Sequence, residues 1–218
     1  MNHLVNEADI LEEIILNSKQ QKVPTNFPQS EEIDWNLKLI SDDTVLNKRE
    51  SKITFNQENN IRYDDLLEIL SFNDKFSKQF MTSSQLKIDQ LVIPERVEGI
   101  TENRCFYSFD SINKTLNKEF DLPTTLQKKE LVIQEEFAQA GVIIIFVASI
   151  DEAYKKSGAL GYKKLVQSIG SIGHYTWLQA IAYGYEGSVF AGFLQKSLRR
   201  FTDLDGYHKA QLFAVALG

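Results

Sequence analysis

The chain has 218 residues, of which 43% are hydrophobic and 11% aromatic, so it can bury a core and is not globally disordered. Its formal net charge of −6 argues against nucleic-acid binding and is ordinary for a cytoplasmic protein. Cys105 is the single cysteine, which excludes an internal disulfide and a multi-cysteine metal site. The three histidines, His3, His174 and His208, lack metal-ligand spacing, so we expect no bound metal.

Residues 1–47 are predicted to form a polar extension, separate from the domain formed by residues 48–218. Within the extension only residues 7–16 have the spacing of a helix. The extension could clasp a neighbouring subunit, bind a partner or be a loose tail. Its acidic start lacks the positive charge of a signal peptide, and the longest apolar run, residues 140–148, is too short to span a bilayer. A cytoplasmic protein without membrane contact is expected.

The domain is predicted to mix helices and strands in an α+β fold, because the hydrophobic period changes several times along it. The expected helices are residues 61–70, 71–82, 124–140 after Pro123, 161–184 and 195–204. The expected strands lie within 87–100 and 104–120, and at 141–149 and 210–217. The last strand is too apolar to be left uncovered.

The helix over residues 161–184 is apolar nearly all round, which predicts burial in the core or between subunits. Gly170 and Gly173 lie on one face of it and allow a backbone or a flat ring to approach closely. Each costs about 1 kcal/mol relative to alanine, which suggests a reason for its presence. Close helix packing at a dimer interface and approach of a ligand both remain open as that reason.

The second half of the domain resembles the nitroreductase-like flavoproteins, in particular the branch that oxidises azoline rings in thiazole- and oxazole-containing peptides, the streptolysin- and microcin-type dehydrogenases. The residues that fall at that branch's spacings are Lys156, Gly161, Tyr162, Lys163, Gly170, Gly184, Gly192, Phe193, Leu217 and Gly218. Upstream, "RESKITF" at 49–55, "RYDDLLEIL" at 62–70 and "MTSSQLKIDQLVIPERVEGI" at 81–100 are similar to the family's flavin-site entry, its following helix and its serine-rich loop. The resemblance covers about residues 48–218.

The resemblance implies a homodimer with a central, mostly antiparallel sheet flanked by helices, a long buried helix at the dimer interface and flavin mononucleotide (FMN) between the subunits. Arg49 and Ser51 would contact the ribityl-phosphate chain, because a phosphate is bound by arginine forks and hydroxyls. The other residues expected at the cofactor are Ser83 and Ser84 beside that chain, Ala191 and Gly192 at the ring edge, and His174 against the flavin or the substrate.

Lys156 matches the lysine that this branch places near the azoline to help remove a carbon-bound proton while hydride goes to the flavin. Tyr162, in the Gly-Tyr-Lys step, is the second expected catalytic residue. The implied function is FMN-dependent oxidation of thiazoline or oxazoline rings in a ribosomally made peptide, beside a cyclodehydratase or another modifying enzyme. A non-catalytic scaffold subunit and a general NAD(P)H oxidoreductase are the alternatives.

Several positions depart from the branch pattern or have a purely structural explanation. Ser157 replaces the usual tyrosine after the lysine, and Glu50 adds a negative charge beside Arg49, which Lys52 could compensate. Lys156 could be a solvated lysine and His174 a buried, hydrogen-bonded one. Arg49 and Ser51 could cap the next element.

Overall fold

The computed structural model describes residues 43–80 and 86–218; Ser83, Ser84 and residues 1–42, on which we made predictions, lie outside these ranges. The elements in chain order are α2 (Asp43–Asn47), α3 (Tyr63–Phe80), β1 (Ile88–Pro94), β2 (Cys105–Asp110), β3 (Thr115–Asp121), η1 (Lys128–Glu130), η2 (Glu135–Gln139), β4 (Val142–Ala148), α4 (Ile150–Ala182), β5 (Gly187–Phe190), α5 (Gln195–Phe201) and β6 (Ala210–Leu217). Within the described part, no helix is both long and apolar enough to cross a bilayer.

One six-stranded sheet, in the order β3-β2-β1-β4-β6-β5, organises the domain, and its named strands all pair antiparallel. Strand β4 is buried along its whole length, as its unbroken run of β-branched and aromatic residues predicts. The apolar strand β6 lies between β4 and β5, so it is covered. The predicted α+β class and antiparallel sheet are confirmed.

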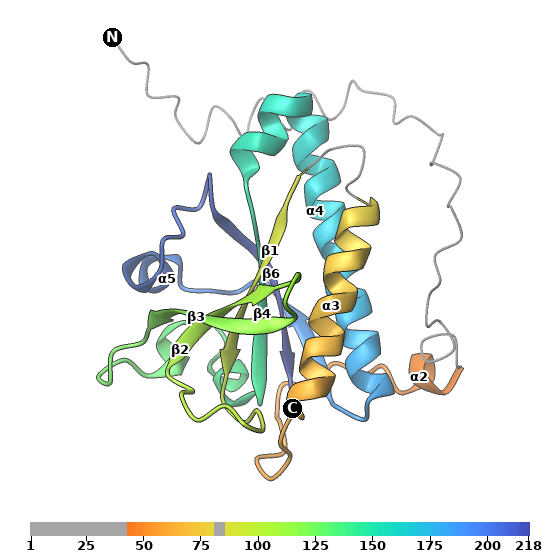
Figure 1. Cartoon of the computed structure of the whole chain (residues 1–218), viewed down its shortest axis with the longest axis vertical. Coiled ribbons are helices and arrows are strands. Elements are labelled where there is room, and N and C mark those ends of the chain that lie inside the picture. Colours follow the sequence, from red (N-terminus) through yellow and green to blue (C-terminus); the bar gives the residue numbers. More distant parts are fainter. Residues whose placement is uncertain (1–42, 81–85) are drawn as a thin grey trace.

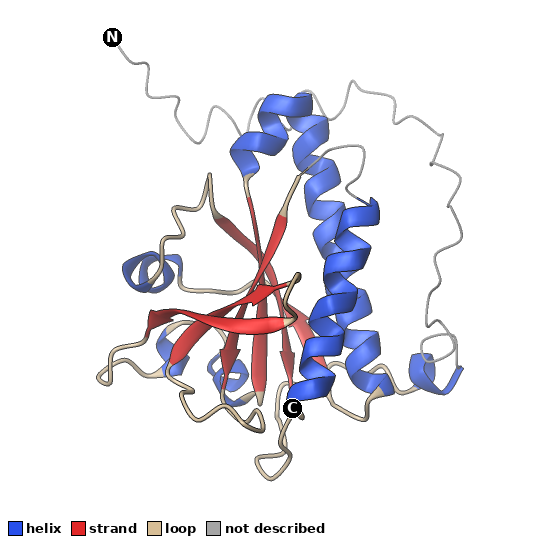
Figure 2. Ribbon diagram, viewed as in Figure 1, coloured by secondary structure: helices blue, strands red, loops and turns tan. Residues whose placement is uncertain are grey.

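Both faces of the sheet are covered, but by different kinds of structure. Helices α3 and α4 lie side by side along one face, whereas η1, η2 and α5 lie on the other (Figures 1 and 2). The two hydrophobic clusters share the strands, whose alternate side chains point to opposite faces. Each cluster is therefore a separate core layer.

Two of the helix predictions are wrong. A single helix, α3, replaces the two expected over 61–82. The segment 124–140 forms two short 3₁₀ turns in place of a helix, because its backbone bonds to the chain after β5. The amide of Ile133 donates to the carbonyl of Gly192 at 2.8 Å, and the amide of Leu194 donates to that of Leu131 at 2.8 Å.

Helix α4 begins at Ile150 rather than at 161, where its start was expected. Ser149 caps it by accepting the amide of Glu152 at 3.1 Å. The backbone then breaks at Ser157 and Gly158, where Gly158 has φ 55° and ψ −144°. A helical segment that carries Lys156 therefore precedes the bend.

The bend brings the two parts of α4 close together at Gly161. A Cβ atom there would lie 2.0 Å from the carbonyl oxygen of Ala153, so only glycine fits. Helix α4 is also less buried than predicted. The sheet and α3 cover one side of it, while Lys163, Val166 and His174 on the other side are exposed.

Candidate functional site

A cation–aromatic pair lies at the C-terminal part of α4. The guanidinium carbon of Arg49 lies 5.0 Å from the ring centroid of Trp177, within the range of a cation–π contact. Trp177 is 4% exposed, and its Nε1 is buried without a hydrogen-bond partner in the described chain. Gly187 makes room for the indole, because a Cβ atom at 187 would lie 2.9 Å from Trp177 Cδ1.

Two serine hydroxyls lie beside this pair. Residues near Ser51 run parallel to the edge strand β5: Ser51 pairs with Gly187, and the amide of Lys52 donates to the carbonyl of Gly187 at 3.2 Å. This register lets the hydroxyls of Ser51 and Ser188 form a hydrogen bond. The side chains of Arg49 and Ser51 therefore contact the core and do not cap an element.

The acidic residue between Arg49 and Ser51 is neutralised locally. Lys52 Nζ lies 2.9 Å from a carboxylate oxygen of Glu50. Its hydrogen bond and charge lower the pKa of Glu50. Lys52 therefore pairs with Glu50 itself, and the positive charge of Arg49 is left unopposed by its neighbour.

His174 lies one turn before Trp177, with its ring edge-on to the indole at a centroid distance of 6.4 Å. The prediction of a buried histidine is wrong, because the residue is exposed on the outer side of α4. Partial burial lowers the pKa of the imidazole, and the positive charge of Arg49 lowers it further. A neutral imidazole at pH 7 can both donate and accept a hydrogen bond.

The two predicted catalytic residues lie elsewhere. Tyr162 and His174 are twelve residues apart on α4, or about 18 Å at 1.5 Å per residue. Lys156 is farther still, in the segment before the bend, and it is exposed, while Tyr162 is half-buried. One chain therefore brings Arg49, Ser51 and His174 together and holds Lys156 and Tyr162 at the other end of the helix.

Ala191 and Gly192 form the turn that follows β5. The carbonyl of Gly192 accepts from Ile133, and the amide of Phe193 donates to the carbonyl of Ala191 at 3.0 Å. Both carbonyls are thus used within the fold. What this turn could offer to a ring edge is its backbone N–H groups.

One group of side chains in the described residues has ligand atoms close enough for a metal. The carboxylates of Glu102 and Asp121 and the thiol of Cys105 lie within 4.8 Å of one another. Lys118 Nζ lies 2.5 Å from Glu102 and 2.8 Å from Asp121, so both carboxylates already have a cationic partner. We assign no metal to this cluster.

Sequence reasoning missed two members of the candidate site, Trp177 and Ser188. Trp177 was recognised only as part of an apolar helix, and its orphan N–H donor is invisible in a sequence. Ser188 stands inside the glycine-flanked segment 184–192, whose small residues were the available signal.

The described part of the chain is thus an α+β domain with an antiparallel sheet, a pair of long helices on one face and an arginine–hydroxyl cluster at the sheet edge. The chain belongs to the nitroreductase family, whose sequence profile matches residues 46–218. None of the curated proteins matches it.

Solved structures give the same fold. A protein described as a nitroreductase from Anabaena variabilis is similar with a TM-score of 0.64 at 20% identity, over 85% of this chain but only 39% of that one. The microcin synthetase McbBCD complex of E. coli with truncated pro-MccB17 bound contains a chain similar over 100% of this protein and 83% of its own length (TM-score 0.61, 15% identity). A nitroreductase-like protein of Exiguobacterium sibiricum in complex with FMN covers 81% and 86% (TM-score 0.54, 11% identity).

Proposed function

We propose that this protein is an FMN-dependent dehydrogenase that oxidises thiazoline or oxazoline rings to thiazole or oxazole in a ribosomally made peptide. The observation that carries the proposal is the Arg49 guanidinium held on Trp177 beside the Ser51–Ser188 hydroxyl pair. Family membership supports an oxidoreductase. The likeness over the whole chain to a subunit of a peptide-modifying complex supports a peptide substrate and a modifying partner such as a cyclodehydratase.

The residues present fit the phosphate-bearing end of FMN. Arg49 supplies a planar fork of donors, and Ser51 and Ser188 supply hydroxyls. The buried Nε1 of Trp177 is a donor that an acceptor of the cofactor would satisfy. Ser83, Ser84, Ala191 and Gly192 stay predicted contacts of the phosphate chain and ring edge.

The split between the two groups of residues on α4 supports a homodimer. Tyr162, Val166, Gly170 and His174 form a stripe at four-residue spacing along the outer side of the helix. Val166 is 43% exposed, and nothing lies within 4 Å of a Cβ atom built at Gly170. If α4 of a second copy runs antiparallel to this helix and crosses it between Val166 and Gly170, Tyr162 of each chain lies opposite His174 of the other.

That arrangement would complete the site from two chains. Lys156 and Tyr162 of one subunit would approach the arginine–hydroxyl cluster of the other. A lysine works as a base only where burial or positive charge favours its neutral form. Lys156 is exposed in the single chain, so the partner subunit would supply the burial.

The chemistry assigned to the chain's own residues is proton removal and substrate placement. FMN, when bound, supplies an acceptor for a hydride from a ring carbon. Lys156 takes the proton from the adjacent ring carbon, and the electron pair of that C–H bond becomes the new double bond. Tyr162 is the second group placed beside the azoline.

Cofactor binding tests the first half of the proposal. Purified protein should absorb at about 450 nm, as flavins do. Arg49→Gln should weaken FMN binding by about 10- to 100-fold, because a charged hydrogen bond contributes about 1.5–3 kcal/mol. Arg200→Gln is the matched control: that arginine also rests on an aromatic ring, Phe201, but on α5. Colourless protein that takes up no FMN would favour the scaffold subunit instead.

Turnover of an azoline peptide tests the second half. Lys156→Ala should abolish azole formation and leave bound FMN in place. Azole formation is measured by mass spectrometry as the loss of two mass units from the peptide. Lys163→Ala, at an exposed position beyond the bend of α4, should remain active. Unchanged turnover by Lys156→Ala would show that Lys156 is not the base. Flavin reduction by NAD(P)H without peptide oxidation points to the general oxidoreductase.

A further inference from the structure

A polar cavity of about 780 Å³ lies between the ends of β1 and β2 and the 3₁₀ turns η1 and η2. Its volume falls within the range of about 300–1,000 Å³ that small-molecule sites occupy. None of the residues of the candidate flavin site lines it. Its lining consists of Gln57, Glu95, Asn103, Arg104, Gln127, Lys128, Lys129, Glu135, Glu136, Ala138 and Gln139.

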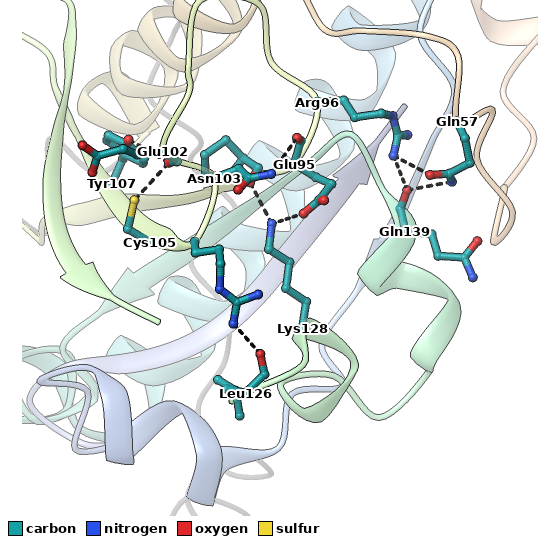
Figure 3. Close-up of polar contacts among 12 residues, drawn as sticks. Gln57, Glu95, Arg96, Glu102, Asn103, Cys105, Tyr107, Leu126, Lys128 and Gln139 are labelled. Carbon is teal, nitrogen blue, oxygen red and sulfur yellow. Dashed lines mark hydrogen bonds and ion pairs between the residues drawn. The ribbon is translucent and has the colours of Figure 1, made fainter. Parts of the chain in front are cut away.

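One wall of the cavity is held by Arg96. Its Nη1 donates to Gln57 Oε1 at 2.8 Å and to the carbonyl of Gln139 at 2.9 Å (Figure 3). Its other nitrogens donate to the carbonyls of Asn56 and Asn59 at 3.2 and 3.3 Å. The two amide residues of this wall, Gln57 and Gln139, are therefore fixed to each other and to the loop before α3.

The opposite wall is held by Arg104 and Glu130. Arg104 Nη2 donates to the carbonyls of Pro123 and Leu126 at 2.5 and 2.6 Å. Glu130 accepts the amide of Gln127 at 2.9 Å, which fixes the start of η1. The cavity is thus formed by tethered segments, which lowers the ordering that a ligand would require.

The charged residues that line the cavity are the cations Arg104, Lys128 and Lys129 and the carboxylates Glu95, Glu135 and Glu136. Lys128 Nζ bonds to Glu95 and to the carbonyl of Pro94 at 2.9 Å (Figure 3). Burial lowers the pKa of Lys128, and the nearby positive charge of Arg104 lowers it further. Glu95 pairs with Lys128, whereas Arg104 forms no salt bridge with a carboxylate of the described residues. The exposed Glu136 and the 3.8 Å pair of Lys129 with Glu135 belong to the solvent side.

Arg104 also has unused donor capacity. Its Nε is buried and has no hydrogen-bond partner among the described residues. A buried donor left without a partner costs about 1–3 kcal/mol, so an acceptor that reaches Nε while Nη2 keeps its two carbonyl bonds would be favoured. A carboxylate matches the planar guanidinium of Arg104 in shape and carries the opposite charge.

We propose that Arg104 and Lys128 bind a carboxylate-bearing ligand in this cavity. Asn103 and Gln127 flank the two cations with amide groups that can donate to and accept from a peptide unit. The carboxylate has two possible sources, an acidic residue of a peptide or a free small acid. This site is independent of the flavin proposal, because it uses different residues on the other face of the sheet.

Calorimetric titration of the full-length protein with three probes tests the site and its source. N-acetyl-glutamyl amide carries a side-chain carboxylate between two peptide units, acetate carries the carboxylate alone, and N-acetyl-glutaminyl amide is the neutral match. Binding of the glutamyl probe but not of acetate assigns a peptide source, and binding of both equally assigns a free acid. Binding of neither, or equal binding of the glutaminyl probe, overturns the proposal.

Two substitutions at one ion pair separate binding from structure. Lys128→Gln removes a cation and should weaken carboxylate binding at least about ten-fold, whereas Glu95→Gln removes the competing carboxylate and should strengthen it. Both break the same pair, so a purely structural role would shift affinity in the same direction for both, and that result overturns the proposal. Lys163→Gln, at an exposed position on α4 outside the lining, should leave the affinity unchanged. None of the three disturbs the carbonyl bonds of Arg104.

Discussion

Arg49 is exposed to solvent, yet the Trp177 ring beneath it restricts where its guanidinium can lie. The ring itself is fixed, because Gly187 lets it pack against the first residue of β5. A flexible surface arginine becomes in this way a pre-positioned donor fork, and less conformational entropy is lost when an anion binds.

His174 should titrate at an unusually low pH for a histidine. Partial burial and Arg49 both lower its pKa below 6.5, so the unfolded chain binds this proton more tightly than the folded one. The stability contributed by the neutral ring is present above pH 6.5 and is lost as the pH falls through the folded pKa. NMR titration of the ring protons should give a midpoint below 6.5.

The same titration separates the two causes. Arg49→Gln should move the midpoint upward, because it removes the positive charge, which is the smaller of the two effects that lower this pKa. Burial should still keep the midpoint below that of the unfolded chain. His208→Gln serves to assign the resonances, since it removes one of the competing signals. A midpoint at or above 6.5 in the unsubstituted protein would contradict the placement of His174 beside Arg49 and Trp177.

At this scale the sequence could predict only the residues that carry a motif. Arg49, Ser51 and His174 were expected from the family resemblance, and the structure brings them together. Ser188 joins them through a contact that spans 137 positions of the chain, which no local pattern encodes. The role of Trp177 could not be predicted either, because it depends on the register of β5.

Among the elements, local patterns predicted the strands well and the helix starts poorly. Strand β4 was clear because it is apolar on both faces. Segment 124–140 has helix-forming residues, but its backbone bonds to residues 192–194 outweigh that propensity. The helix start expected at residue 161 falls just after the bend at Ser157 and Gly158, where the structure has helix on both sides.

The bend in α4 makes a stability prediction. Gly158 has φ 55° and ψ −144°, a conformation that an L-residue rarely adopts, so Gly158→Ala should lower the free energy of unfolding by about 1–3 kcal/mol. Ser157→Ala is the control at the neighbouring residue of the bend. Ser157 is exposed and has φ −151°, which any L-residue adopts, so this change should alter the free energy of unfolding by no more than about 0.5 kcal/mol. Urea denaturation measures both; equal losses would mean that the bend has no conformational requirement.

On the scale of the whole molecule, helix α4 packs one side against the sheet and leaves its other side exposed to solvent. The face of α4 turned away from the sheet carries the stripe Tyr162, Val166, Gly170 and His174, with Val166 43% exposed. Along this stripe the two groups of predicted site residues are about 18 Å apart. An isologous contact through the stripe is the simplest way to bring unlike ends of two identical helices together.

Val166→Glu should therefore separate the subunits. In a two-fold contact it places two carboxylates near each other and out of water, which costs several kcal/mol, so dissociation should become easier by far more than ten-fold. Ile112→Glu is the control, because it makes the same exchange at a side chain that is 90% exposed at the tip of the β2–β3 hairpin. Sedimentation equilibrium should show twice the 25.0 kDa chain mass for the unsubstituted protein and the control, and the chain mass for Val166→Glu. Since the flavin site is proposed to need both chains, absorbance at about 450 nm should fall with the dimer. A monomer that holds flavin as tightly as the unsubstituted protein would show that one chain suffices, and Lys156 would then have no route to the cofactor.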